Sequence, residues 1–175
     1  MKNALVALTL FAISTYACAE TPPPAYQRAA AAGPVPPEVL YAIAKIESNF
    51  KTTIGFYPWP WTLNIKGQSH YFATRGEACN AALEGLQKHG KYGVDIGLTQ
   101  QNWGWVGSQF YQNPCDALAP NENLTNAAIA LRRCFEKEGD WGRAAGCYHR
   151  PAGGEPARRY QAAFNKRYAQ IVGTR

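Results

Sequence analysis

The 175-residue sequence predicts a mainly α-helical domain that carries one small β-hairpin element. Three observations support this fold class. Apolar residues recur at helical spacing over most of the chain. Proline, capping and glycine signals divide these stretches into separate helices. One segment instead combines aromatic and β-branched residues on both sides of Lys66-Gly67-Gln68, which is typical of two short strands and a turn. No internal repeat or long linker divides the chain, so we expect one domain.

The chain begins with a segment typical of a secretory signal peptide. Lys2 precedes an apolar run over residues 4–13, and Ala17-Cys18-Ala19 matches a small-x-small cleavage site. A membrane anchor would need a longer apolar run. A lipid-modified Cys18 would be expected to follow a leucine, which residues 15–17 lack. We therefore expect residues 1–19 to be removed during export, with no transmembrane segment after signal cleavage.

The next elements are a loose lead and two helices. We expect residues 20–32 to form the lead and a short alanine-rich helix that ends near Gly33. Pro36 and Pro37 begin the next helix, because proline is tolerated in a first turn whose amides lack partners. This helix extends to about Ser48.

The predicted hairpin pairs residues 61–65 with 69–74 and belongs to an insert at 57–74. Thr74 and Glu77 then have the spacing of a capping box, which begins a helix that continues to about His89. Residues 90–97 are either irregular or a short strand. The remaining predicted helices cover residues 103–111, 122–138, 140–149 and 155–172.

The cysteines and the charge indicate the compartment and the class of partner. Four cysteines follow the signal segment and predict two disulfides with three pairings open. Neighbouring helices favour Cys134 with Cys147, which leaves Cys79 with Cys115. No C-x-x-C motif occurs and the histidines are scattered, so we expect no metal and no cofactor. The formal charge of +6 fits an acidic polymer, an anionic lipid or an ordinary solvated surface, whereas export argues against nucleic acid.

Glu47 interrupts the apolar face of the helix that ends near Ser48. It follows Leu40 and Ile43 at i+7 and i+4, which places it on the inward side of the last turn. Burial and the negative end of the helix dipole both disfavour a carboxylate. Both should raise the pKa of Glu47, as a general acid requires. Periodicity alone also fits a boundary glutamate that is solvated or paired with Lys45 or Lys51.

Three motifs together resemble a known family. Glu47-Ser48 is followed by DIGLTQQN at 95–102 and by GDWGRAAGCYHRP at 139–151. In this order and spacing they resemble the soluble lytic transglycosylases (SLT domains), which are close to goose-type lysozymes. The likeness is strongest with small members that accompany conjugation and secretion machines, and it covers roughly residues 33–151.

This resemblance implies a lysozyme-like transglycosylase domain over residues 33–175. It also implies that peptidoglycan glycan strands are the substrate, in the periplasm of a bacterium. Components of a conjugation or secretion apparatus are the implied partners. The enzyme would cut the β-1,4 bond between N-acetylmuramic acid and N-acetylglucosamine and would form a 1,6-anhydro product.

The resemblance also assigns roles to single residues. It implies that Glu47 is the sole catalytic acid and base, and that substrate is bound by Ser48, Gln100, Asn102 and Tyr148. The stretch PNENLTNAAIALR at 120–132 is similar to the Pro-x-x-Asn-Leu helix start of the family, a structural feature. Three positions depart from the family pattern and put the shape of the cleft in doubt more than the chemistry: Thr99, Gln101 and His149.

Two other interpretations remain open. Asp95 could supply the second carboxylate that ordinary glycoside hydrolysis needs, which would make the protein a lysozyme-type hydrolase. Its place beside a glycine-rich turn favours a backbone-capping role instead. The chain could also be a non-catalytic glycan-binding subunit. Because most aromatic side chains are core, we expect only a minority of six candidates to stack on sugars: Trp59, Trp61, Tyr71, Trp103, Trp105 and Tyr111.

Overall fold

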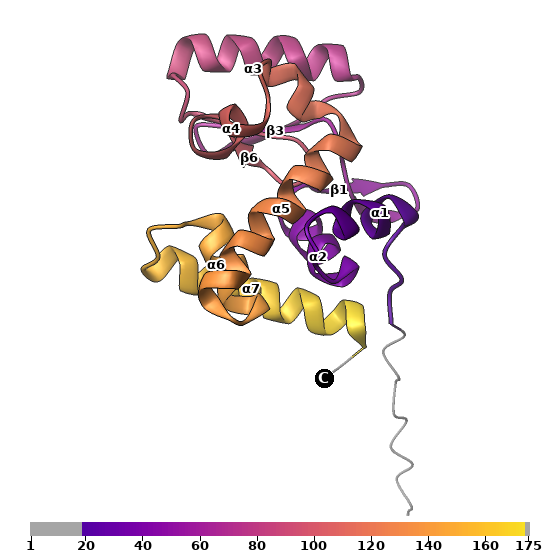
Figure 1. Cartoon of the computed structure of the whole chain (residues 1–175). Helices are drawn as coiled ribbons and strands as arrows, with labels where there is room; N and C mark the ends of the chain where they lie inside the picture. Colours follow the sequence, from indigo (N-terminus) through magenta and orange to yellow (C-terminus); the bar gives the residue numbers. More distant parts are fainter. Residues whose placement is uncertain (1–18, 174–175) are drawn as a thin grey trace, which may run out of the picture.

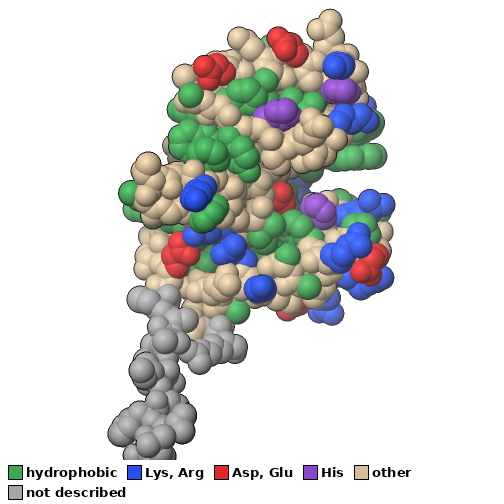
Figure 2. All heavy atoms as spheres, turned by 180° about the vertical axis from the view of Figure 1, so that it is seen from behind, with side chains coloured by type: hydrophobic (Ala, Val, Ile, Leu, Met, Phe, Trp, Pro, Cys, Tyr) green, Lys and Arg blue, Asp and Glu red, His purple; other side chains and the backbone are tan. Residues whose placement is uncertain are grey.

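The computed structural model describes residues 19–173, so the predicted signal peptide, apart from Ala19, lies outside the described residues. The described part is mainly α-helical, as predicted. Its helices and sheets form two lobes that are joined by one long helix, α5 (Pro120–Glu138) (Figure 1). A cavity of about 770 Å³ opens between the lobes and is visible from behind as a notch (Figure 2).

The lower lobe in Figure 1, called the α-lobe here, is built from helices around one apolar core. Leu40, Ile43, Leu131 and Phe164 are among its fully buried side chains. Besides most of α5, its elements are α1 (Pro24–Ala32), α2 (Pro37–Glu47), α6 (Trp141–His149) and α7 (Glu155–Val172).

The upper lobe, called the β-lobe, contains an antiparallel sheet in the order β4-β3-β5-β6. Its strands are β3 (Thr62–Ile65), β4 (Gln68–Tyr71), β5 (Val94–Ile96) and β6 (Gln101–Asn102). Helix α3 (Arg75–His89) covers the sheet face that carries Leu63, Val94 and Ile96. The π-helical turn η1 (Trp103–Gly107), the helical turn α4 (Ser108–Phe110) and the 3₁₀ turn η2 (Pro114–Leu118) complete the lobe.

Local sequence signals account for most element boundaries. Prolines occupy the first turns of α1, α2, α5 and α7. At α3 the predicted capping box is confirmed, because Thr74 Oγ1 accepts from the Glu77 amide (3.2 Å) and the Glu77 carboxylate accepts from the Thr74 amide (3.1 Å). The β3–β4 hairpin closes with Lys66 at φ 51° and Gly67 at φ 86°, the positive values that a type I′ turn needs.

The β content exceeds the single predicted hairpin. Strands β1 (Asn49–Thr52) and β2 (Gly55–Pro58) form a separate two-stranded sheet directly after α2. Residues along this hairpin do not alternate between buried and exposed, so the period-2 signal of a strand is absent. The segment at 90–97, expected to be irregular or a short strand, contains strand β5, which pairs with both β3 and β6.

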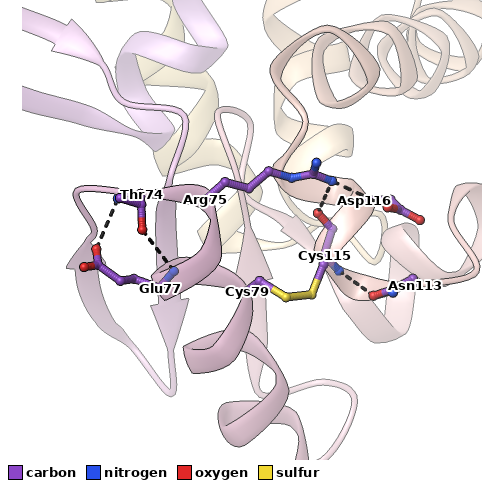
Figure 3. Close-up of a disulfide and its surroundings, with 7 residues drawn as sticks. All are labelled: Thr74, Arg75, Glu77, Cys79, Asn113, Cys115 and Asp116. Atoms are coloured by element: carbon purple, nitrogen blue, oxygen red, sulfur yellow. Dashed lines mark hydrogen bonds and ion pairs between the residues drawn. A yellow bond between two sulfur atoms is a disulfide. The ribbon is translucent and has the colours of Figure 1, made fainter.

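Each lobe contains one disulfide, and both favoured pairings are confirmed. Cys134–Cys147 joins α5 to α6, and Cys79–Cys115 joins α3 to η2. Around the second bridge, Arg75 Nη2 donates to the Cys115 carbonyl (2.9 Å), and the Asn113 side chain accepts from the Cys115 amide (2.9 Å) (Figure 3). Disulfides of this kind persist in oxidising compartments.

Within residues 19–173 no helix is both long enough and apolar enough to cross a membrane.

We predict that the double substitution Cys79→Ala and Cys115→Ala lowers the free energy of unfolding by about 4 kcal/mol, because the bridge closes a loop with a sequence separation of 36 residues. Urea unfolding at equilibrium measures the loss. Arg75→Ala is the control. It removes a half-exposed ion pair with Asp116 and an exposed hydrogen bond to the Cys115 carbonyl but keeps the bridge, so its effect should stay below about 1.5 kcal/mol. Equal losses in both variants would show that loop closure is not what stabilises this region.

Candidate active site

The cavity between the lobes receives side chains from both of them. Carboxyl groups and a histidine lie among polar and aromatic neighbours there, and Figure 2 shows acidic and histidine side chains at the edge of the notch. The lining residues from the α-lobe are Ile46, Glu47, Tyr148, His149, Arg150, Pro151 and Ala152. Those from the β-lobe are Asn64, Ser69, Asp95, Gln100, Gln101, Asn102, Trp105 and Val106.

Glu47 is the last residue of α2, and it faces this cavity rather than open solvent. Its side chain keeps only 15% of its exposure. Within the described residues one group hydrogen-bonds to the carboxylate, the Tyr160 hydroxyl, which donates to Oε1 over 2.6 Å. Lys45 pairs with Glu20 at 2.7 Å instead. The interpretation of Glu47 as a solvated or Lys45-paired boundary residue is therefore wrong.

The pKa of Glu47 is raised from 4.5 to about 8. Burial is the largest cause, because it removes water from around the charged form. The hydrogen bond from Tyr160 opposes the rise, since it stabilises the carboxylate, and the charge of Asp95 adds to it. At neutral pH the Glu47 carboxyl therefore holds a proton, which is the state that a general acid needs.

His149 and Tyr160 form a stacked pair beside the carboxyl group. Their ring centroids lie 4.3 Å apart with an interplanar angle of 8°. His149 Nδ1 is 4.0 Å from Glu47 Oε1, too far for a hydrogen bond. Burial lowers the pKa of His149 and Arg150 acts in the same direction, so the imidazole is neutral at pH 7. His149 therefore places no positive charge within bonding distance of the Glu47 carboxyl, and such a charge would have lowered its pKa.

One turn, residues 97–100, connects β5 to β6 and ends in Gln100, which lines the cavity from the β-lobe. Gly97 adopts φ 83°, and a Cβ at this position would lie 2.6 Å from the Asn123 Nδ2 atom. Only glycine fits this backbone and this approach. Gln100 closes the turn with φ 45°, and its amide donates to the Gly97 carbonyl (3.1 Å).

Three helices hold this turn by side-chain hydrogen bonds. From α2, Ser48 Oγ donates to the Leu98 carbonyl (2.7 Å). From α6, the Tyr148 hydroxyl donates to the Thr99 carbonyl (2.9 Å). From α5, the fully buried Asn123 accepts from the Thr99 amide and hydroxyl, and it donates to the carbonyls of Ile96 and Ala117. The Asn123 side chain is thereby saturated.

These contacts correct the substrate-binding role expected for Ser48. Its side chain is completely buried and its hydroxyl bonds to Leu98 and to the Ala44 carbonyl (3.1 Å). No ligand in the cleft can reach it. Tyr148 does line the cavity with Glu47, as expected, but its hydroxyl is engaged by Thr99.

Asn102 lines the cavity, yet it too is committed to the protein. Its Nδ2 donates to Asp95 Oδ1 (2.8 Å) and the Tyr92 carbonyl (3.1 Å), and its Oδ1 accepts from the amides of Gly104 and Trp105. All its donors and acceptors are used, so Asn102 lies in the cleft as expected but has no free hydrogen-bonding group for a ligand. Gln100 donates both Nε2 hydrogens to the Thr62 and Gly97 carbonyls, so its Oε1 is the atom left to accept from a ligand.

The backbone-capping role expected for Asp95 is also wrong. Asp95 lies inside β5, and its carboxylate pairs with Asn102 across the β5–β6 ladder. Burial raises its pKa, and the Asn102 hydrogen bond acts in the opposite direction. The cleft therefore contains two carboxyl groups, one on each lobe.

Of the six aromatic residues expected to include sugar contacts, one lines the cavity, Trp105. Trp61 and Trp103 pack against the β-lobe core, and Tyr111 is buried. Trp59 donates from Nε1 to the Phe72 carbonyl, and Tyr71 packs at a tilted angle against Phe50 and does not line the cavity.

Sequence reasoning missed Tyr160 and gave Asn123 only as part of a helix start. Tyr160 lies 113 residues from Glu47 along the chain, and its position on the inward face of a predicted helix is equally typical of core. Asn123 carries a stronger signal, because a buried asparagine in the first turn of an amphipathic helix needs partners outside the helix.

Comparisons with known proteins found no matching family model, no matching curated protein and no matching solved structure.

We predict that Glu47→Gln alters how stability depends on pH. Because the folded-state pKa of Glu47 (about 8) exceeds its ordinary value of 4.5, the folded protein holds a proton there that the unfolded chain releases. This contribution is complete below about pH 4.5 and disappears as the pH rises through 8. The glutamine side chain still accepts from Tyr160 but never ionises, so the variant should gain on the order of a few kcal/mol over wild type between pH 5 and pH 9.

Urea unfolding of both proteins at pH 5, 7 and 9 measures this difference, in which the titrating groups that do not interact with Glu47 cancel. A stability difference that stays constant from pH 5 to pH 9 would mean that the pKa of Glu47 is not raised.

We further predict that Asn123→Ala lowers the free energy of unfolding by about 3 kcal/mol, because it leaves buried groups of the turn at 97–100 without partners. Asn121→Ala is the matched control. It lies exposed in the same first turn of α5, and its effect should stay within about 0.5 kcal/mol. Chemical denaturation compares the two, and similar small losses would show that the turn does not depend on Asn123.

Proposed function

We propose that the protein is a peptidoglycan lytic transglycosylase with a lysozyme-like fold. It cleaves the β-1,4 bond between N-acetylmuramic acid and N-acetylglucosamine and leaves a 1,6-anhydro end. One observation carries this proposal: Glu47 presents a protonated carboxyl, with a pKa near 8, inside a cavity of about 770 Å³. That volume is in the range of ligand-binding clefts. The three motifs shared with the soluble lytic transglycosylases support the same conclusion.

The reaction needs one carboxyl group. The Glu47 carboxyl gives its proton to the glycosidic oxygen while the bond from that oxygen to C1 breaks, and the bonding electrons leave with the oxygen. The positive charge at C1 is shared with the N-acetyl oxygen of the same muramoyl residue. The Glu47 carboxylate then takes the proton of the C6 hydroxyl as O6 bonds to C1. Glu47 ends protonated, and no water is consumed.

The surroundings of Glu47 suit both halves of this cycle. Burial keeps the proton on Glu47 until the glycosidic oxygen is in place. The Tyr160 hydroxyl, 2.6 Å from Oε1, stabilises the carboxylate that exists between the two proton transfers. With its pKa near the working pH, one residue acts first as acid and then as base.

Asp95 supports a second candidate function, a lysozyme-type muramidase. It lines the same cavity from the opposite lobe, and hydrolysis of a glycoside ordinarily uses two carboxyl groups. Against this, the Asp95 carboxylate is held by Asn102 at 2.8 Å. A subunit that binds glycan without cutting it is the alternative outside enzymes.

The proposal places the protein in the periplasm of a bacterium, where it would open the wall locally around a conjugation or secretion apparatus. Two disulfides fit an oxidising compartment of this kind. The link to such an apparatus comes from the small family members that the motifs resemble.

Mass spectrometry of muropeptides released from purified peptidoglycan tests the function. We expect wild type to release 1,6-anhydro-muramoyl products, Glu47→Gln to lose about 10²–10⁴-fold in rate, and Asp95→Asn to stay within about tenfold of wild type. The wild-type rate should fall as the pH rises through about 8, because the free enzyme must carry the proton on Glu47.

Other products would decide between the alternatives. Reducing muramoyl ends, together with a large loss in Asp95→Asn, would identify a hydrolase. Bound glycan without any cleavage by wild type would identify a binding subunit.

A further inference from the structure

Trp105 is an exposed aromatic residue in the wall of the cleft. It keeps 63% of its exposure while it lines the cavity. Exposed apolar patches that are rimmed by polar residues mark interaction sites and ligand-binding grooves. Trp105 is not alone, because the Tyr92 ring, 49% exposed, lies 4.3 Å from it between centroids with an angle of 34°.

The protein holds these two rings in place from several sides. Asn102 Oδ1 accepts from the Trp105 amide (3.2 Å) and the Gly104 amide (3.1 Å), which fixes the start of η1. Asn102 Nδ2 also donates to the Tyr92 carbonyl (3.1 Å). A Cβ on Gly104 would lie 2.3 Å from the Tyr92 ring, so glycine is needed for this close packing. The exposed indole therefore has a rigid support.

A row of polar side chains leads across the sheet to this pair of rings. Neighbouring strands pair Ser69 with Asn64, Asn64 with Asp95, and Asp95 with Asn102. All four residues line the cavity, whereas the adjacent row, which contains Leu63 and Ile96, is buried against the β-lobe core. Because Asn102 caps η1, Trp105 lies where the row ends at β6.

We propose that Trp105, supported by Tyr92, is a platform on which the C–H face of one N-acetylated, β-linked hexopyranose stacks, with the chain of sugars running along the polar row. Such a residue has an apolar face that an indole can cover, and a rim of hydroxyl and amide groups that Ser69, Asn64 and Asp95 of the row can bind, while Asn102 holds the platform. The inference rests on the proposed function for the identity of the sugar, but the platform binds glycan whether or not the bond is cut.

Binding of N-acetylchitotetraose tests the platform without any reaction. In two-dimensional NMR spectra, the Trp105 indole N–H signal, identified by its absence in Trp105→Ala, should shift on titration. The signals of the core residues Trp61 and Trp103 should move less. Trp105→Ala should raise the Kd about tenfold and Trp105→Phe about threefold, since phenylalanine keeps a smaller stacking face.

Phe56→Ala is the matched control, because Phe56 is a similarly exposed aromatic (56%) on β2 that does not line the cavity. Its Kd should equal that of wild type. Circular dichroism melting of each variant confirms folding, and the Phe variant covers the case in which Trp105→Ala does not fold. Unchanged affinity in both Trp105 variants, a static Trp105 signal, or no binding by wild type would each overturn the platform.

The outcome is separable from that of the proposed function. Trp105-dependent binding without any anhydro product would refute the transglycosylase and keep the platform. Anhydro product together with binding that does not depend on Trp105 would support the transglycosylase and refute the platform.

Discussion

The cleft depends on how one turn, residues 97–100, is held between the lobes. Ser48, Tyr148 and Asn123 reach it from α2, α6 and α5, and each bonds to a different part of its backbone. Since Ser48 directly follows Glu47, the bond that fixes the turn also fixes the end of the helix that presents the acid. The wall of the β-lobe and the carboxyl of the α-lobe are thus aligned by a few hydrogen bonds, together with the buried Leu98 side chain of the turn, which packs into the α-lobe core.

The charge state of Glu47 results from two opposed effects of unequal size. Moving its pKa from 4.5 to about 8 corresponds to a bias on the order of 5 kcal/mol toward the protonated form. The single hydrogen bond from Tyr160 favours the carboxylate by about 1–3 kcal/mol. Burial therefore dominates, and the phenol limits its effect. Without Tyr160 the pKa of Glu47 would be higher still, which would hinder the base step of the proposed reaction.

Much of the fold could be predicted from the sequence, because local signals fix it. Prolines, the Thr74–Glu77 capping box and the Lys66-Gly67 turn set boundaries with little help from distant residues. The β1–β2 hairpin escaped prediction because its burial does not alternate. In the site, helical periodicity predicted the inward side of the last turn of α2 for Glu47, but it fitted a solvated boundary residue equally well. The hydrogen bonds that occupy the side chains of Ser48 and Asn102 could not be predicted, since their partners are brought together only by the tertiary structure.

The two disulfides lie within the lobes, and among the described residues neither spans the cleft. Oxidation consequently stiffens each half of the molecule, whereas hydrogen bonds to the turn at 97–100, and no disulfide, join the two halves across the cleft. Reduction would loosen the halves internally, but it would remove no restraint on how far they part.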